Sequence, residues 1–229
     1  MGKNFSMARE LMTTAHIASV PSRVESLRQC VQAIYNQVDK VYVMLNGYSE
    51  VPSFLRDLRF ANCELLDNSL GDSARYLHVN DEKGVCVFVD DDLVVSNQHV
   101  AYLLSGIKKY NGIVGLHGRK YLAGSGFKQW VGNYRCLGTV SDDVHVNLIG
   151  SGICAFSNER LYVHVSDFKR KNMADIFLSK AATEQGVPMI VLKHQSGYVR
   201  YIPTTDGQTI WRTTRDYSYH TEMLKSYIK

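Results

Sequence analysis

Short apolar runs alternate with amphipathic segments along the first half of the chain. The apolar runs are strand-length, and residues 85–89 are apolar throughout, as in a strand buried on both faces. Between the runs, apolar residues recur at three- and four-residue spacing, which predicts helices. The alternation predicts an α/β fold, a mainly parallel doubly wound sheet flanked by helices, in a single domain. The expected strands are residues 15–20, 40–45, 63–66, 85–89 and 112–116.

The second half of the chain is less regular. Residues 119–144 are rich in glycine, aromatic and charged residues without clear periodicity, which predicts a long functional loop region. The tail from His194 to Lys229 also lacks a clear period. The expected elements are a strand over residues 146–156 interrupted by Gly150-Ser151-Gly152, a short helix over 158–163, a helix over 172–184 and a strand over 187–192.

Composition narrows the class of protein. A chain of 229 residues can bury a sizeable core, and a net charge of +4 suits small anionic ligands without indicating a nucleic-acid partner. No apolar run approaches the roughly 20 residues of a membrane span. Residues 1–12 lack the apolar core of a signal peptide. The five cysteines are odd in number and lack metal-type spacing, so we expect reduced core thiols in a cytoplasmic protein.

Three consecutive carboxylates, Asp90, Asp91 and Asp92, follow the apolar run of residues 85–89 directly. Packed together without partners, they would cost several kcal/mol through desolvation and like-charge repulsion. Mn²⁺ or Mg²⁺ would relieve this cost, because hard cations prefer carboxylate oxygens and substrate phosphates. Ligands of open α/β sheets bind beyond the carboxyl ends of the strands. The pattern therefore favours a metal-bound ligand over a solvated acidic turn.

Four loops are expected at this edge of the sheet, because each follows a predicted strand or leads into the next one. They supply an arginine, polar turn groups, a second arginine and the carboxylates, which suits a metal-bound diphosphate joined to a base and a sugar. Taken alone, Arg23 or Arg75 could equally be a charged residue on the surface with no ligand. The loops are residues 21–23, 46–48, 71–75 and 90–92.

The ordered set of motifs resembles the nucleotide-sugar glycosyltransferases of GT-A fold, whose D-x-D motif ends a buried strand. It is most similar to the single-domain capsule-polysaccharide (heparosan-type) N-acetylglucosaminyltransferases and to algal-virus glycosyltransferases of similar size. The resemblance implies a nucleotide-sugar donor, most often UDP-linked, a glycan acceptor, and Mn²⁺ or Mg²⁺. Rhamnose, glucose and N-acetylglucosamine donors all stay open. The matching segments are residues 37–41, 45–46, 50–52, 88–92, 112–118 and 150–152, with Asp175, Gly207 and Trp211.

The resemblance also implies an organisation and a set of roles. Residues 1–12 are expected to be a flexible tail, and residues 13–229 one GT-A domain. Its nucleotide-sugar-binding half would be residues 13–117 and its acceptor-binding half residues 118–229. Such a domain works alone, beside a partner glycosyltransferase or as a module of a longer polypeptide.

The implied metal ligands are Asp92, Asp90 and, after the last strand, His194. The alternative for His194 is a surface histidine, and His117 is expected to be a satisfied histidine at the sheet edge. The remaining donor contacts are expected from Arg23 and Asn46 at uracil, Arg75 at the nucleotide or sugar, Asp91 at a sugar hydroxyl, and Gly150, Ser151 and Gly152 where a sugar approaches the backbone. Two roles stay open for Trp130, Tyr134 and Trp211: stacking on sugar rings, or packing in the core.

Asp175 is the implied catalytic residue. In inverting enzymes an acid at this helix start acts as general base on the acceptor hydroxyl, whereas in retaining enzymes it stabilises the reacting centre or holds the donor. The sequence leaves inversion and retention open. A structural alternative is an acid at the third position of a helix capped by Asn172.

A different enzyme class also fits residues 88–94. The haloacid-dehalogenase-type phosphotransferases carry a similar hhhDxDx[TV] pattern, in which Asp90 would be the nucleophile and Asp92 the general acid. Asp142 and Asp143 would then supply the later acidic pair. That motif normally ends the first strand of its domain, whereas three strands are predicted before residue 90. A non-catalytic sugar-binding module would leave the three carboxylates unexplained.

Overall fold

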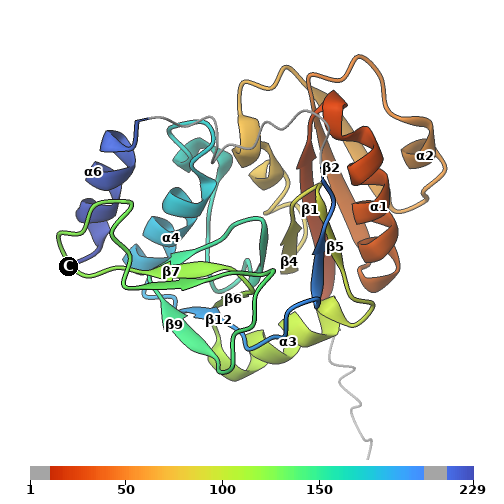
Figure 1. Ribbon diagram of the computed structural model, residues 1–229. Coiled ribbons are helices and arrows are strands. Elements are labelled where there is room, and N and C mark those ends of the chain that lie inside the picture. Colours follow the sequence, from red (N-terminus) through yellow and green to blue (C-terminus); the bar gives the residue numbers. More distant parts are fainter. Residues whose placement is uncertain (1–10, 204–215) are drawn as a thin grey trace, which may run out of the picture.

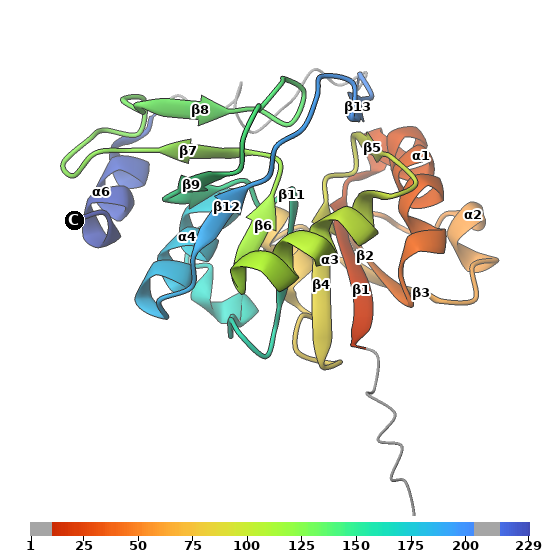
Figure 2. The same cartoon turned by 90° about the horizontal axis from the view of Figure 1, so that it is seen from below.

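The computed structural model describes residues 11–203 and 216–229. Its centre is an eight-stranded sheet in the order β3-β2-β1-β4-β11-β6-β12-β9 (Figures 1 and 2). The first four strands of that order run parallel, and β11 then enters antiparallel between β4 and β6. The strands are β1 (Met12–Ser19), β2 (Lys40–Asn46), β3 (Ala61–Leu66), β4 (Gly84–Val89), β6 (Ile113–Gly115), β9 (Val144–Val146), β11 (Ile153–Ser157) and β12 (Met189–Val191).

Strand β4 is buried along its whole length, as its apolar sequence predicts. Val85, Val87 and Val89 pack on one face of the sheet with α1 and α3, while Cys86 and Phe88 pack on the other face with α4 and α6. Figure 1 shows α4 and α6 at one end of the molecule and α1 at the other. The predicted α/β fold with helices on both faces is therefore confirmed. The helices are α1 (Val24–Ile34), α2 (Ser53–Arg56), α3 (His99–Tyr110), α4 (Ala174–Glu184) and α6 (Ser218–Tyr227).

Two small sheets and four short 3-10 helices complete the described part of the chain. In the sheet β10-β7-β8, β8 and most of β7 come from the segment that we expected to be a long loop region, whereas β10 comes from the predicted strand over 146–156. Strand β13 pairs with β5 beyond the acidic cluster. These elements are β5 (Leu93–Val95), β7 (Gly118–Lys120), β8 (Gly132–Tyr134), β10 (Leu148–Ile149), β13 (Val199–Tyr201), η1 (Pro21–Arg23), η2 (Tyr35–Gln37), η3 (Gly71–Tyr76) and η4 (Val165–Asp167).

The structure corrects several expectations about the second half. Residues 158–163 form no helix, and the predicted strand over 146–156 is divided among β9, β10 and β11. Helix α4 starts at Ala174 after Met173 rather than being capped by Asn172, which has a φ of 62°. The aperiodic tail contains α6. At the other end, β1 already begins at Met12, inside the expected tail, and residues 1–10, Gly207 and Trp211 lie outside the described residues.

The cysteines form no disulfide bonds within the described residues. All five cysteines are free, and Cys30, Cys86 and Cys154 are buried. Across residues 11–203 and 216–229, the helices are too short or too polar to traverse a bilayer.

We predict that His16 makes the protein less stable in acid. Its ring is buried between Tyr42 and Phe88, with centroids 5.1 and 5.2 Å away. Burial, helped by His78, lowers the pKa of His16 from 6.5 to about 3. Below pH ~6.5 the unfolded chain therefore binds a proton that the folded protein excludes, so stability falls by up to ~1.4 kcal/mol per pH unit between these two values.

The variant His16→Phe removes this titration while keeping an aromatic ring in the stack. In urea unfolding from pH 7 to pH 4, its free energy of unfolding should decline less steeply than that of the wild type. Parallel curves for the two proteins would contradict this account.

Candidate active site

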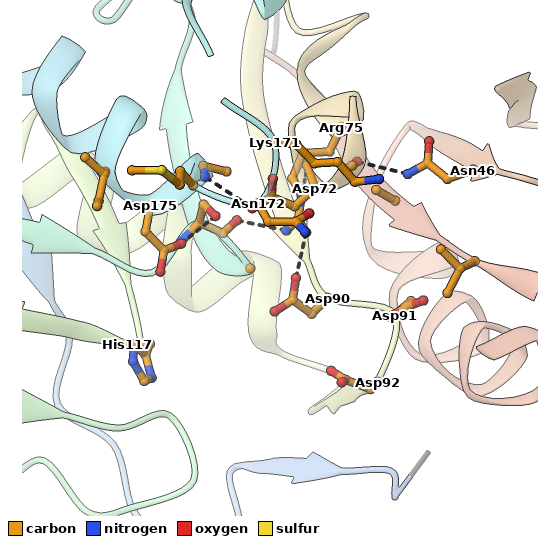
Figure 3. A pocket seen from close by; sticks show the side chains of 18 of the residues that line it. Asn46, Asp72, Arg75, Asp90, Asp91, Asp92, His117, Lys171, Asn172 and Asp175 are labelled. Carbon is orange, nitrogen blue, oxygen red and sulfur yellow. Dashed lines mark hydrogen bonds and ion pairs between the residues drawn. The ribbon is translucent and has the colours of Figure 1, made fainter. Parts of the chain in front are cut away.

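A cavity of about 910 Å³ opens beyond the carboxyl ends of β1, β2 and β4 (Figure 3). Its wall is formed by η1, η3, the loop after β4, the loop between β10 and β11, and the start of α4. Three of the four predicted loops, residues 21–23, 71–75 and 90–92, therefore gather at this sheet edge as expected. The loop of residues 46–48 contributes only Asn46. Predicted site residues in the wall are Arg23, Asn46, Arg75, Asp90, Asp91, Asp92, Ser151, Gly152 and Asp175.

Arg23 provides the counter-charge for two of the clustered carboxylates. Its Nη1 lies 2.9 Å from Asp91 Oδ1 and 3.3 Å from Asp92 Oδ2. Burial nevertheless raises the pKa of Asp91. Burial, together with the charges of Asp90 and Asp91, raises the pKa of Asp92 to about 7. Arg23 alone does not balance Asp91 and Asp92, and a bound cation would be favoured beside Asp92.

Asp90 is held between an arginine and a glycine. Its Oδ1 pairs with Arg75 Nη2 at 2.8 Å, and a Cβ on Gly152 would lie 1.9 Å from its Oδ2. Only a residue without a side chain leaves room for this carboxylate. Arg75 itself is 5% exposed and donates to the carbonyl oxygens of Asp72 and Ser151. Burial works against its charge, but Asp90 and Asp72 raise the pKa of Arg75 above its ordinary value.

Asp175 is the second residue of α4, and its carboxylate does not cap the helix. Its Oδ1 accepts hydrogen bonds from Ser151 N at 2.7 Å and from Ser151 Oγ at 2.6 Å. The first backbone N–H of α4, that of Ala174, instead donates to Asp72 Oδ2 at 3.1 Å. Asn172 therefore does not cap the helix as expected, although Asp175 does lie in the first turn of α4, where an acid favours the helix start.

Asn46 reaches the cavity from the end of β2. Its Nδ2 donates to Gly71 O at 2.9 Å, and its buried Oδ1 has no hydrogen-bond partner in the described part of the protein. An acceptor in this position suits a ligand group that carries an N–H or O–H donor.

His194 and Gly150 are not brought into the cavity wall. His194 is buried rather than at the surface, and its Nδ1 and Nε2 lie 2.8 Å from Leu192 O and 3.1 Å from Arg135 O. Gly150 packs against the His117 side chain. Over residues 11–203 and 216–229, no three His, Cys, Asp or Glu side chains form a ready metal site. A cation at Asp90 and Asp92 would therefore need oxygens from its ligand as well.

A second group of residues lines the cavity without having been predicted from the sequence, and His117, expected to be a satisfied histidine at the sheet edge, also lies in the wall. Burial lowers the pKa of His117, although the charges of Asp175 and Asp90 oppose this.

Arg119 lies over the Trp130 ring at 4.9 Å, whereas Tyr134 packs against the core and is absent from the wall. The mixture of charge and aromatic residues in 119–144 was the available signal. The other missed wall residues include Asp72, Asn133, Arg135, Lys171, Asn172, Tyr217 and His220.

The phosphotransferase alternative gains no support from the structure. Asp143 pairs with Lys109 Nζ at 2.8 Å and Tyr110 Oη at 2.6 Å, and neither Asp142 nor Asp143 lines the cavity. The strand that carries Asp90 is preceded by β1, β2 and β3 in the same sheet.

Comparison with known proteins identifies the fold. No family model and no curated protein matches the sequence. Among solved structures, residues 1–349 of S. aureus TarS, a GT-A glycosyltransferase, superpose with a TM-score of 0.55 at 12% identity over 84% of this chain. This chain has the GT-A fold, and it spans 60% of the length of that TarS chain.

Two weaker matches were also found. A197 from STIV has 14% identity and a TM-score of 0.44, over 83% of this chain and 84% of its own. A mycobacterial protein has 15% identity and a TM-score of 0.36, over 45% of this chain and 39% of its own.

We predict that Gly152→Ala displaces the Asp90 carboxylate and breaks its pair with Arg75. Overpacking of this kind costs about 1–3 kcal/mol, and Arg75 would keep a buried charge with one partner fewer. Urea unfolding should show the loss. Gly138→Ala is the control, because its added Cβ meets nothing closer than 3.4 Å. Equal stability of the two variants would show that Asp90 does not depend on the space at Gly152.

Proposed function

We propose that this chain is a metal-dependent glycosyltransferase that moves a sugar from a nucleotide-sugar donor, with UDP as the expected nucleotide, to a hydroxyl of a glycan acceptor. The observation that carries the proposal is the position of Asp90, Asp91 and Asp92. They follow a fully buried strand and line the cavity at its end, where two guanidinium groups, those of Arg23 and Arg75, face the three carboxylates.

The residues fit a divalent cation shared with a diphosphate. Carboxylate oxygens are the donors that Mn²⁺ and Mg²⁺ prefer, and the missing side chain at Gly152 makes room for the Asp90 carboxylate at the cavity wall. Asp92, with its pKa raised by burial and like charges, and Asp90 would hold the ion. When bound, the ion supplies charge stabilisation for the departing diphosphate. Asp91, tied to Arg23, is better placed to orient that arginine than to ligate.

The rest of the donor extends along the wall on both sides of this point. Asn46 offers its Oδ1 as acceptor for a base N–H at the β2 end. The sugar would lie in the cavity beside Asp90 and Gly152, next to Asp175. The acceptor would enter over Trp130 and Arg119 from the β7–β8 side.

Asp175 is the proposed catalytic residue. Ser151 occupies its Oδ1, and no hydrogen bond within the described residues involves its Oδ2. In an inverting reaction Oδ2 takes the proton of the acceptor hydroxyl, and in a retaining reaction the same carboxylate stabilises positive charge on the donor sugar. The stereochemical outcome decides between the two.

The first test is metal-dependent binding. At a concentration 100 times Kd, UDP should stabilise the protein by about 2.7 kcal/mol in the presence of Mn²⁺, and EDTA should abolish the shift in melting temperature. Asp92→Asn, which keeps the volume but removes the charge, should lose the shift. Asp142→Asn, an exposed aspartate outside the cavity, should retain it. Equal shifts with and without metal would rule out the role of the cluster.

The second test concerns chemistry at Asp175. Asp175→Asn should lower kcat by roughly 10²–10⁴-fold while leaving the affinity for UDP within about twofold, because a general base acts after the donor is bound. UDP release measures the rate, and the anomeric proton coupling of the first-formed product reports inversion or retention. A folded Asp175→Asn protein with wild-type kcat would remove Asp175 from the reaction.

A further inference from the structure

A continuous chain of contacts joins the two carboxylates on either side of the proposed sugar position. Asp90 Oδ1 lies 2.8 Å from Arg75 Nη2, and Arg75 Nη1 donates to Ser151 O at 3.2 Å. Ser151 then donates from both N and Oγ to Asp175 Oδ1, at 2.7 and 2.6 Å. Figure 3 shows Arg75 above Asp90 and Asp175 across the cavity. Two residues thus span from the end of β4 to the start of α4.

The two linking residues are poorly suited to contact a ligand directly. Arg75 is 5% exposed and Ser151 3% exposed. All three polar groups of Ser151 are committed, its N–H and hydroxyl to Asp175 and its carbonyl oxygen to Arg75. The three nitrogens of the Arg75 guanidinium each have a partner, since Nε donates to Asp72 O at 2.9 Å. The sequence predicted that Arg75 and Ser151 contact the donor directly, whereas these hydrogen bonds favour an indirect role for both.

The loop that carries Ser151 is fixed at its far end as well. Asp90 N donates to Gly152 O at 2.7 Å, next to the register in which β11 pairs with β4. Ser151 is consequently held from the Asp90 side by backbone and by Arg75, and it holds Asp175 in turn. Any shift of the loop would move Asp175 relative to Asp90.

We infer that Arg75 and Ser151 are positioning residues that set the spacing of Asp90 and Asp175 across the sugar site. The inference is founded on the proposed glycosyl transfer. Ser151 acts on the carboxylate that serves chemistry, so its loss lowers kcat. Arg75 acts on the carboxylate at the metal and diphosphate, so its loss weakens donor binding. Such precision matters because a misplacement of about 1 Å between reacting groups can cost 100-fold in rate.

A double-mutant cycle on Ser151 and Asp175 tests the link. The assay measures UDP release from whichever of UDP-glucose, UDP-N-acetylglucosamine and UDP-rhamnose the wild type cleaves fastest. Ser151→Ala keeps the backbone N–H but removes the Oγ bond, and kcat should fall about tenfold with the Kd for UDP and Mn²⁺ unchanged within twofold. In the Asp175→Asn background the same change should have no further effect on kcat, since no carboxylate remains to be oriented. Ser157→Ala, at the end of β11 and outside the cavity, is the control with wild-type kcat.

Arg75→Lys provides the second arm, because lysine keeps the charge but cannot reach three partners in fixed directions. It should weaken UDP–Mn²⁺ binding about tenfold, while Ser151→Ala does not. Wild-type kcat in Ser151→Ala, or losses that multiply in the double variant, would overturn the inference even if Arg75→Lys fails to fold. A wild-type protein that neither binds UDP with Mn²⁺ nor releases it from any of the three donors would instead contradict the proposed function itself.

Discussion

The site depends on placing three carboxylates side by side at the end of a strand that is buried on both faces. The strand cannot move to relieve them, because Val85, Val87 and Val89 lock it to one layer of helices and Cys86 and Phe88 to the other. The repulsion among the three carboxylates must therefore be offset by charged groups next to them. Arg23 pairs with Asp91 and Asp92 from η1, and Arg75 pairs with Asp90 from η3. Three carboxylates that face two guanidinium groups are the reason to expect a cation.

Close packing of the 150–152 loop also fixes the positions of the carboxylates. The antiparallel entry of β11 beside β4 brings Gly152 against Asp90, where a Cβ would not fit. The same loop presents Ser151 to Asp175. A single connection between β10 and β11 thereby joins the half of the domain that holds the acidic cluster to the half that holds α4. The fold shared with TarS supplies this scaffold, while the chemistry of the cavity belongs to this chain's own side chains.

The sequence by itself determined the α/β alternation, the buried β4 and the acidic cluster at its end, because hydrophobic period and run length are local properties that survive folding. It also pointed to three residues that line the cavity, Arg23, Asn46 and Arg75, through their loops, whereas Asp175 came from the resemblance. In a largely parallel sheet the carboxyl ends of neighbouring strands share one edge, so such loops meet without any further information.

The tertiary structure alone decided how these residues pair and which others join them. Nothing in the local pattern near Asp72 indicates that it serves the first N–H of α4, 102 residues away, or that Ser151 holds Asp175. The same holds for Tyr217, which reaches the cavity from an aperiodic tail. For His194 the local position was misleading. Its place after a strand predicted a metal ligand, whereas its two ring nitrogens lie beside the backbone carbonyl oxygens of Leu192 and Arg135. These outcomes depend on strand order and on the antiparallel direction of β11, which are set by packing across the whole sheet and leave no trace in the period of any one segment.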